Sequence, residues 1–468
     1  MPSPVKLPTS SSDPKAAVER SALFVTTLTS FMGPFMISSV NVALPAIQQD
    51  FDMNAVELSW VATAYLLAMA VGLLPAGKIA DIHGRKKIFT LGLFVHTISA
   101  ALAALTHSMG IFIFLRVIQG LGASLYVPTG MAIVTSVFPP ERRGRAIGIY
   151  VAAVYVGLSV GPFVGGFLTQ QLGWHSVFAL MLPLGALGMI ITRIFLKGEW
   201  ADSRDPKLDI GGCLIYAGAM LSLVWGASTL PSETGMVLVT AGALGLIFFF
   251  FHQRRSLHPV FDVSLFMHNK TFAFSSLAAL LNYAATYALT FMMSLYLQYI
   301  KEMTPQAAGT LLMAQPVIMA AFSPVVGQLS DRIQPRFLST AGMALTAFGM
   351  AVFTRLSGNT SLVHIAVVLV VLGFGFAFFS SPNTSAIMGA VEKKDYGIAS
   401  SAVSIMRLMG QMTSMAIATL VLNLLVGQHA IDPETYDQFL LSVQTVFTIS
   451  ALLCTVGIFF SMFRGRLK

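Results

Sequence analysis

Long apolar runs alternate with short polar segments along the whole chain. From Ser21 to Phe463 each apolar run is about 20 residues long, enough for a helix to cross a ~30 Å hydrocarbon layer. The runs are continuous and lack the strict alternation of membrane strands, so they indicate helices rather than a barrel. We predict an all-α polytopic membrane protein with fourteen spans, near 21–44, 58–80, 88–107, 111–137, 146–170, 175–196, 209–229, 236–252, 271–298, 306–330, 336–355, 362–390, 400–427 and 440–463.

The composition supports this class. Of the 468 residues, 55% are hydrophobic and only 10% are charged, whereas soluble globular proteins carry about 25% charged residues. Both cysteines, Cys213 and Cys454, lie in apolar runs without metal-ligand neighbours, so we expect no disulfide framework, no metal site and no cofactor. The sequence contains no phosphate-binding loop of the GxxxxGK[ST] type, so it gives no support for a process driven directly by ATP hydrolysis.

The basic residues lie mostly on one side of the predicted spans. All Lys and Arg residues except four fall in the loops on the side of the N-terminus, and the positive-inside rule makes that side cytoplasmic. The four exceptions are Lys301, Arg355, Arg116 and Arg407. An even number of spans then places both termini in the cytoplasm. The net charge of +8 reflects this topology, and we expect no nucleic-acid partner.

Two segments of the first half recur weakly in the second half. GKIADIHGRKK at 77–87 is echoed by GQLSDRIQPR at 327–336, an offset of 250 residues. GLGASLYVPTG at 120–130 is echoed by GFGFAFFSSPN at 373–383, an offset of 253 residues. Echoes in the same order and at nearly the same offset indicate a duplicated six-span unit, as in transporters built from parallel repeats.

These observations divide the chain into four parts. Residues 1–20 are polar and rich in Pro and Ser, and we predict a disordered cytoplasmic tail there, without a cleavable signal. Residues 21–197 and 271–468 are predicted to form two six-helix bundles. Residues 198–270 are predicted to be a linker that contains two inserted spans.

A tight turn between spans two and three carries the first candidate site, a conformational-switch loop. Gly77 is expected to permit close helix approach, and Gly84 is expected to adopt the positive φ that other residues resist. Asp81 is expected to face a helix N-terminus or a cation across the gap between the halves, and Arg85 and Lys86 complete the motif. Such contacts would hold one conformation and break in another. The alternative is an ordinary basic loop.

The second half carries a weaker copy of this turn. Gly327, Asp331 and Arg332 occupy the corresponding positions, but the second glycine and the basic cluster are missing. We expect the copy to form a turn at the same membrane face.

Span five contains a glycine-rich stretch, GLSVGPFVGG at 157–166. Its glycines at Gly157, Gly161 and Gly165 are four residues apart and therefore share one helix face, which favours close helix packing. Pro162 is expected to add a kink or a local loss of backbone hydrogen bonding, and Gly166 follows it. We predict that this face contacts a helix that moves during function. A plain packing strip is the alternative.

Span four contains a single arginine, Arg116, in the stretch IFIFLRVIQGLGASLYVPTG at 111–130. A guanidinium in the membrane centre costs roughly 2.5–3.5 kcal/mol on insertion scales, so Arg116 must face a cavity or a partner. We predict a cavity charge that binds an anionic substrate group or tunes a titrating neighbour, grouped with Gln119, Gly120 and Asn41. The alternative is a clamp on backbone carbonyls, such as those of residues 157–166.

Three of these motifs resemble signatures of the major facilitator superfamily: the turn at 77–87, RVIQGLGAS at 116–124 and GPFVGG at 161–166. The last of them marks the antiporter branch. With fourteen spans, VNVALP at 40–45 and PVFDVSLFMHNKTF at 259–272, the chain is similar to the fourteen-span drug:proton antiporter family. The resemblance implies the major facilitator fold, alternating access, proton-driven export and a central cavity between the halves.

The chain departs from that family at one acidic position. The family usually carries an aspartate in span one, and Met36 occupies that position here. No acidic residue lies deep in any predicted span. The candidates for a titrating group are therefore shallow acids or two span histidines, namely Asp81, Glu141, Asp50, Asp52, Glu57, His96 and His364.

The missing acid also bears on the substrate. Exporters of lipophilic cations commonly use a buried carboxylate as the counter-charge, and this cavity offers Arg116 instead. Its other candidate lining residues are amides and tyrosines, namely Tyr65, Tyr126, Asn282, Tyr283 and Tyr287. The set favours neutral, zwitterionic or anionic amphiphiles.

We therefore predict a monomeric secondary transporter of the cell (inner) membrane, in contact with lipid, that exports hydrophobic or amphipathic small molecules with H⁺ as the coupling ion. One alternative is an exporter of a specific metabolite or lipid-like anion with non-standard or no proton coupling. Another is a non-transporting membrane sensor. An enzyme is not expected, because no cluster of His, Asp or nucleophilic residues lies at a predicted membrane face.

Overall fold

The computed structural model describes residues 14–201, 208–256, 259–260, 263–330, 332–391 and 396–465. Within these ranges all regular elements are helices, and fourteen helical segments are long and apolar enough to cross a membrane. The fourteen predicted spans are therefore confirmed. The first half contains α1 (Pro14–Phe51), α2 (Ala55–His83), α3 (Arg85–Ala103), α4 (Met109–Val137), α5 (Pro140–Leu172), α6 (His175–Ala179) and α7 (Met181–Ile194).

The remaining helices form an inserted pair and a second half. The pair is α8 (Ile210–Thr229) and α9 (Glu233–Arg255). The second half contains α10 (Val263–His268), α11 (Lys270–Leu295) with its π-helical extension η1 (Tyr296–Ile300), α12 (Pro305–Leu312), α13 (Ala314–Leu329), α14 (Pro335–Phe353), α15 (Leu362–Gly389), α16 (Tyr396–Leu425) and α17 (Tyr436–Phe463).

The predicted tail at 1–20 is wrong for its last seven residues. Helix α1 begins at Pro14, so residues 14–20 form its first two turns, and residues 1–13 lie outside the described ranges. Proline is tolerated in the first turn of a helix, and Lys15 and two alanines that follow it are good helix formers.

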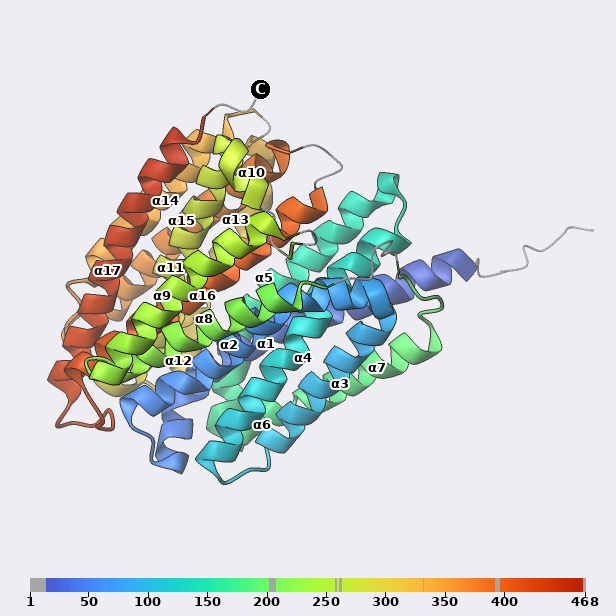
Figure 1. Ribbon diagram of the computed structural model, residues 1–468. Helices are drawn as coiled ribbons and strands as arrows, with labels where there is room; N and C mark the ends of the chain where they lie inside the picture. The colour runs from blue at the N-terminus through green and yellow to red at the C-terminus, as the bar shows by residue number, and fades with distance from the viewer. Residues whose placement is uncertain are drawn as a thin grey trace, which may run out of the picture.

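The two halves repeat one packing scheme. In the first half α1 packs on α5, and α4 packs on both α2 and α3. In the second half α11 packs on α16, and α15 packs on both α13 and α14. Corresponding glycines make corresponding crossings, because Gly120 of α4 lies against α2 and Gly373 of α15 lies against α13. The halves form two bundles side by side (Figure 1). The two-bundle fold class is confirmed.

The inserted pair lies across one of the two seams between the halves. The halves meet where α5 packs on α12 and α13, and again where α2 packs on α16. Helix α8 contacts both α2 and α16, and in Figure 1 α8 and α9 cross in front of that seam. Trp60 of α2 packs edge-on against Trp225 of α8 with 6.1 Å between ring centroids, and Asn423 of α16 donates to the Ser228 carbonyl at 3.0 Å.

Asp209 joins the start of α8 to the end of α9. One of its oxygens accepts hydrogen bonds from the Gly212 amide at 2.8 Å and from His252 of α9 at 3.1 Å, and the other accepts from Gln253 at 2.8 Å. Burial opposes ionisation of the carboxyl, but the hydrogen bonds outweigh it and hold the pKa of Asp209 below its usual value. The charge also lies at the positive end of α8.

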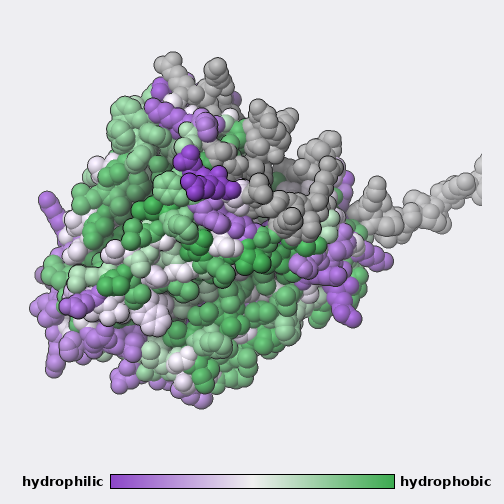
Figure 2. Space-filling view, in the orientation of Figure 1, coloured by the Kyte–Doolittle hydropathy of each residue, from purple (hydrophilic) through white to green (hydrophobic). Residues whose placement is uncertain are grey.

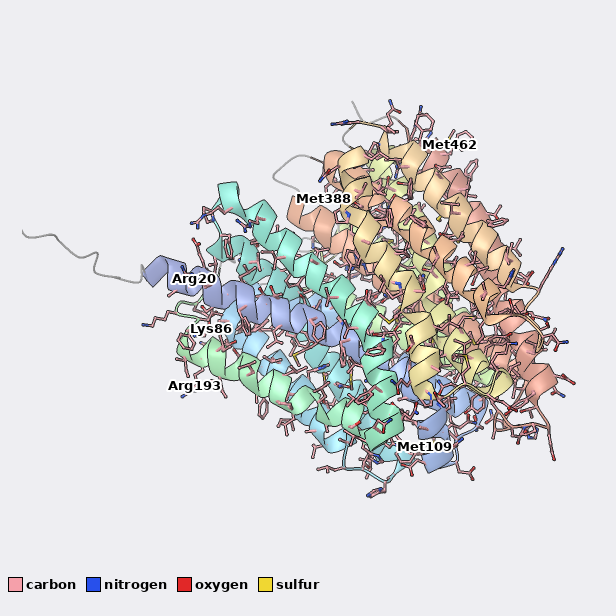
Figure 3. The ribbon with its side chains drawn as sticks, turned by 180° about the vertical axis from the view of Figure 1, so that it is seen from behind. Arg20, Lys86, Met109, Arg193, Met388 and Met462 are labelled. Atoms are coloured by element: carbon pink, nitrogen blue, oxygen red, sulfur yellow. The ribbon has the colours of Figure 1, made fainter. Side chains whose placement is uncertain are left out.

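The surface is that of a membrane protein. Figure 2 shows a broad hydrophobic face with hydrophilic residues gathered towards its edges. Large apolar side chains of α9 are open to the surroundings, with Val237 66% and Leu244 60% exposed. Arg20, Lys86 and Arg193 gather at one end of the first half (Figure 3), and Met109 lies at its other end.

Candidate functional site

Arg116 lies about two turns from the start of α4 and is buried, with 1% of its surface exposed. Its Nε donates a hydrogen bond to the Val61 carbonyl of α2 at 2.9 Å, and its NH1 group donates to the side-chain oxygen of Gln119. Its guanidinium carbon lies 4.6 Å from the centre of the Tyr65 ring, a cation–π contact. Among the residues that the structure describes, no carboxylate pairs with Arg116. Its positive charge is therefore held by neutral groups alone.

The close approach of α2 and α4 brings Arg116 to its carbonyl partner. A Cβ atom at Gly120 would overlap the Tyr65 carbonyl, so glycine is required for this crossing. Residues 157–166 do not supply the carbonyl. They belong to α5, which continues as a helix through Pro162.

An aromatic cluster with unsatisfied polar atoms adjoins Arg116. The His96 ring packs edge-on against Tyr126 at 5.2 Å and Tyr65 at 6.3 Å, and its Nδ1 lies 3.3 Å from the Gln119 carbonyl oxygen. The His96 Nε2 and the Gln119 Nε2 are buried without a hydrogen-bond partner among the described residues, and the buried hydroxyls of Tyr65 and Tyr126 pair with each other. Buried polar atoms without partners are uncommon in native proteins and are candidates for ligand contact.

A second buried arginine, Arg407 of α16, lies in the other half. Its guanidinium carbon is 5.3 Å from the Tyr283 ring centre, and it interacts electrostatically with Tyr150 and Tyr155 of α5 in the first half. Its Nε is buried and has no hydrogen-bond partner within the described ranges. Sequence reasoning left Arg407 out of the site, although its position as a lone charge inside a span was a sufficient signal.

The other predicted cavity residues divide between two environments. Tyr287 of α11 interacts electrostatically with Tyr65 and Arg116, and therefore joins the two halves at this level. Asn282 does not line the cavity as predicted, because its amide donates to the Met343 sulfur at 3.3 Å inside the second half. Asn41 is buried in α1, and its side chain makes no hydrogen bond to a described residue, Arg116 included.

The switch loop has the predicted turn but not the predicted partners. Gly84 separates α2 from α3 with φ of 105°. Asp81 binds Arg85 of its own half, with 2.8 Å between the carboxylate and guanidinium, and does not reach across the gap in this conformation. Arg85 also donates to Ser136 of α4. The predicted close approach at Gly77 is wrong, because a Cβ atom there would meet nothing within 4 Å.

A segment after α7 holds the same turn from the other side. Glu199 accepts a hydrogen bond from the backbone amide of Lys86 at 2.7 Å, and the Trp200 carbonyl accepts from the Arg85 amide at 2.8 Å. The Lys86 ammonium donates to the Leu196 carbonyl. Glu199 thereby caps the start of α3, where a negative charge is favoured.

The weaker turn of the second half is described only in part. A Cβ atom at Gly327 would approach the Ser381 hydroxyl to 2.9 Å, so Gly327 lies at a crossing of α13 and α15. Arg332 follows α13 and is exposed. Asp331 lies outside the described residues.

The span-five glycines pack mainly on α1, and the prediction that they contact a moving helix stays a prediction. Cβ atoms at Gly157 and Gly165 would lie 2.6 Å from Phe31 and Ser39 of α1, inside the same half. Gly161 also faces α1, and its carbonyl accepts from Ser39 at 2.8 Å. The contact with the other half is made by residues that directly follow two of these glycines in the sequence.

Pro162 and Gly166 of α5 make that contact with α12. A Cβ atom at Gly309 would overlap the Pro162 carbonyl, and one at Gly166 would overlap the Pro305 carbonyl. The spacing of the glycines along α5 indicated one packing face of this helix. The face next to it is the one that contacts the second half.

Hydrogen bonds close the halves together at the end opposite the chain termini. They join Gln298 to Val42 (2.9 Å), Tyr299 to Gln48, His429 to Ala55 (2.9 Å), Gln428 to Asn54 (2.9 Å), Thr419 to Ser59 (2.9 Å) and Gln306 to Gln170 (3.3 Å). Between the centre and the end that carries the termini, Tyr155 of α5 hydrogen-bonds to Ser323 of α13 and Ser380 of α15. Closer to that end, no hydrogen bond between two described residues joins the halves. The hydrogen bonds between the halves are therefore concentrated at the end opposite the termini.

The shallow acids remain at helix ends. Asp50 accepts from Trp174 at 3.0 Å, and Glu57 forms a capping box with Asn54 at the start of α2. His364 is exposed in the first turn of α15, so it is not an interior histidine. His96 is the interior one.

Comparison with known proteins identifies the architecture. The sequence model of the Major Facilitator Superfamily matches residues 26–275 and 275–467. The chain belongs to the major facilitator superfamily. This membership and the fourteen apolar helices make it a multi-pass membrane transporter rather than an enzyme, and its resemblance to drug-efflux members is confirmed by its relatives.

Several curated superfamily members resemble this transporter over most of their length. The riboflavin transporter RibZ of Clostridioides difficile (strain 630) is 29% identical over 447 residues, covering 93% of this chain and 95% of the relative. The multidrug resistance protein Stp of Mycobacterium tuberculosis is 31% identical and covers 85% of this chain and 75% of its own. The tetracenomycin C resistance and export protein of Streptomyces glaucescens is 30% identical over 77% of this chain and 68% of its own.

Solved structures share the fold. A POT family transporter in complex with 5-aminolevulinic acid superposes with a TM-score of 0.71 at 16% identity, covering 94% of this chain and 96% of that one. A bacterial homologue of the human lysosomal transporter Spinster superposes with a TM-score of 0.67 at 16% identity, covering 97% of both chains.

Proposed function

We propose that this transporter is a proton-linked exporter of hydrophobic or amphipathic small molecules. It would work as a monomer in the cell (inner) membrane, by alternating access, with both termini in the cytoplasm. Relatives named for multidrug resistance and for tetracenomycin C and methylenomycin A resistance support export of such compounds. The basic residues at the end that carries the termini support the orientation (Figure 3).

With this orientation, the closed end is the outer one. The polar contacts between η1 and α1 and between α16 and α2 then form an outer gate, and the conformation is inward-facing. A substrate would reach the Arg116 cluster from the cytoplasm. Export requires these outer contacts to break while new contacts form near the switch loop.

The substrate class follows from the charge of the central cluster. Arg116 is buried with neutral partners only, and this is the observation that carries the proposal. Arg407 contributes a second cation from the opposite half, near Tyr155. No acidic residue of the described spans lies away from a helix end to hold a cation. A neutral, zwitterionic or anionic amphiphile fits this field, with its acidic or carbonyl groups on the guanidinium and its rings against the tyrosines.

We propose that His96 takes up the coupling proton. Its Nε2 is buried, has no partner among the described residues and lies in the same aromatic cluster as Arg116 through Tyr65. A proton on this nitrogen would add a second positive charge to the cluster and change its affinity for an anionic group. His96→Gln should therefore remove the response to a pH gradient, and His364→Gln, at an exposed position, is the matched control.

One alternative has a specific observation in its favour. RibZ, named a riboflavin transporter, matches 93% of the length of this chain. This match supports dedicated transport of a single polycyclic metabolite. The aromatic cluster of Tyr65, Tyr126 and His96 suits a planar ring system as well as it suits a mixed set of drugs.

Transport in proteoliposomes separates these proposals. A panel of neutral, anionic, zwitterionic and dicationic amphiphiles, with riboflavin included, would be measured with an imposed pH gradient, with and without sodium. We expect several neutral or anionic compounds to be driven by the pH gradient, and Arg116→Ala to lose binding of the anionic ones in detergent. Unchanged affinity in Arg116→Ala would remove Arg116 from the substrate site. Uptake of riboflavin alone would select the alternative.

A further inference from the structure

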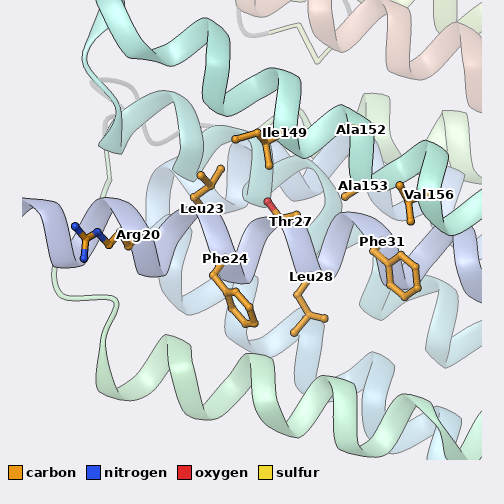
Figure 4. A pocket seen from close by; sticks show the side chains of 10 residues that line it. All are labelled: Arg20, Leu23, Phe24, Thr27, Leu28, Phe31, Ile149, Ala152, Ala153 and Val156. Carbon is orange, nitrogen blue, oxygen red and sulfur yellow. The ribbon is translucent and has the colours of Figure 1, made fainter. Parts of the chain in front are cut away.

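A groove of about 640 Å³ lies between α1 and α5, outside the central cluster. Arg20 lies at one end of its α1 wall and Phe31 at the other (Figure 4). Eleven residues of helix separate them, which corresponds to about 16 Å at 1.5 Å per residue. This is close to half of a ~30 Å hydrocarbon core, the depth of one lipid leaflet. The volume also falls within the ~300–1,000 Å³ range of small-molecule sites.

The groove opens on the membrane side of the first half. In Figure 4 the side chains of Phe24 and Leu28 point towards α7, and Leu28 lies near Gly188 of that helix. Phe24 and Val156 on the two walls are 49% and 48% exposed. The residues of the central cluster, including Arg116, do not line it. The groove is therefore separate from the proposed substrate site.

The interior is apolar and one hydroxyl in it is unsatisfied. Small side chains at Ala152 and Ala153 of α5 leave the space that Leu28 and Phe31 border. The Oγ1 atom of Thr27 is buried and has no hydrogen-bond partner among the described residues. An alkyl chain would cover this apolar wall.

Two unpaired arginines lie at the end of the groove that carries the chain termini. Arg20 is exposed, and Arg145 is exposed on α5 four residues before Ile149, hence one turn away on the same face. Neither makes a hydrogen bond or ion pair to a described residue. Among the described side chains at this mouth, the acid Glu19 is neutralised, because it binds Arg142 at 2.9 Å. The mouth of the groove is therefore cationic while its depth is apolar.

We propose that this groove binds an anionic phospholipid of the adjacent leaflet. One acyl chain lies between α1 and α5, and the phosphate lies between the guanidinium groups of Arg20 and Arg145. The negative phosphate of the lipid matches the positive charge at the mouth of the groove. Its apolar acyl chain matches the wall in length and in polarity. Both walls belong to the first half, whose glycine strip fixes α1 on α5, so the lipid stays bound while the halves move.

Native mass spectrometry of the full chain, delipidated in detergent, tests this site. The protein would be titrated with phosphatidylglycerol, with phosphatidylcholine of the same acyl chains, and with inorganic phosphate. We expect phosphatidylglycerol to bind most tightly, and the double variant Arg20→Gln, Arg145→Gln to weaken it about 30-fold. That loss is roughly 2 kcal/mol at 1.4 kcal/mol per tenfold, or about 1 kcal/mol per basic residue at a membrane surface.

Two further variants separate the groove from the general lipid layer. Ala152→Trp fills the groove from an exposed position and should abolish the tight site even with both arginines present. Arg193→Gln removes a basic residue at the same end of the first half but outside the groove, and should leave binding unchanged. Thermal unfolding of each variant in detergent confirms that it is folded.

Four results would overturn the proposal. Equal affinity for phosphatidylcholine would remove the role of the arginines. Equal loss in Arg193→Gln would show general surface attraction. Displacement of the lipid by a transported compound, with Ala152→Trp blocking transport, would make the groove part of the substrate route instead. Binding of inorganic phosphate as tight as that of phosphatidylglycerol would show a free-anion site without a lipid chain.

Discussion

The backbone carbonyl of Pro162 in α5 lies so close to Gly309 in α12 that a Cβ atom on Gly309 would overlap it. This is a contact between the two halves, made by backbone against backbone. It lies beside Gly166, which meets the Pro305 carbonyl in the same way. The glycine-rich stretch of span five therefore contains two surfaces: a glycine strip that packs on α1, and a Pro–Gly edge that touches the opposite half.

Gly309→Leu should block the transport cycle while each half stays folded. A leucine cannot fit against the Pro162 carbonyl, so the halves cannot close at this end. Gly161→Leu should instead lower the thermal stability, because it forces α1 away from α5 within one half. Gly148→Leu is the matched control, since a Cβ atom there meets nothing within 4 Å. Normal transport by Gly309→Leu would show that the halves do not close here during the cycle.

Asp81→Asn should cut transport strongly and leave expression and folding near normal. The substitution removes the ion pair that fixes Arg85, which has only 14% of its side chain exposed and also binds Ser136. An exposed or half-exposed ion pair contributes little to stability, about 0–1 kcal/mol, so a large effect must come from the conformational equilibrium. Initial transport rates and thermal unfolding of the same preparation measure the two effects. A wild-type rate would refute the switch role.

Arg116→Lys should impair transport even though the charge is kept. Lysine cannot contact the Val61 carbonyl and the Gln119 amide at once in the planar geometry of a guanidinium. Substrate affinity by tryptophan fluorescence and transport rate should fall together. Full activity of the lysine variant would mean that only a point charge is needed.

Met36→Asp should extend recognition towards lipophilic cations. Met36 is fully buried in α1, so the new carboxylate would supply a counter-charge that the described spans lack. Met36→Leu is the control for the loss of the thioether. Efficient export of dications by the unmodified chain would refute the argument from the missing acid.

Asp209→Ala should loosen the inserted helix pair by about 0.5–2 kcal/mol, the usual cost of removing an N-cap. Asp209→Asn keeps the cap on Gly212 and should cost less. The pKa of Asp209 is depressed in the folded state, so its stabilising effect is present above the usual carboxyl pKa of about 3.9 and disappears as the pH falls through the lower folded-state value. In unfolding measured from pH 7 down to pH 3, the wild type and Asp209→Ala should therefore begin to converge below about pH 4. Constant separation of the two curves would contradict the assignment.

The spans were predictable because length and hydropathy alone decide which segments cross a membrane. The positive φ of Gly84 was predictable because few residues other than glycine accept it. The packing partners of Gly161, Gly77 and Arg116 could not be predicted from the sequence. Spacing along a helix identifies residues that share a face, but it does not identify the helix that covers this face. Asn282 shows the same limit, since its amide donates a hydrogen bond to the Met343 sulfur instead of lining the cavity.

The six hydrogen bonds that join the halves at the end opposite the termini are all made by neutral groups. Each neutral hydrogen bond contributes a net 0.5–1.5 kcal/mol or so, and the six together amount to several kcal/mol, an energy gap that preferential binding of a ligand to the other state can reverse. No ion pair between described residues joins the halves. Screening by dissolved salt acts on charges and not on such bonds. The strength of these six contacts should therefore be nearly independent of ionic strength.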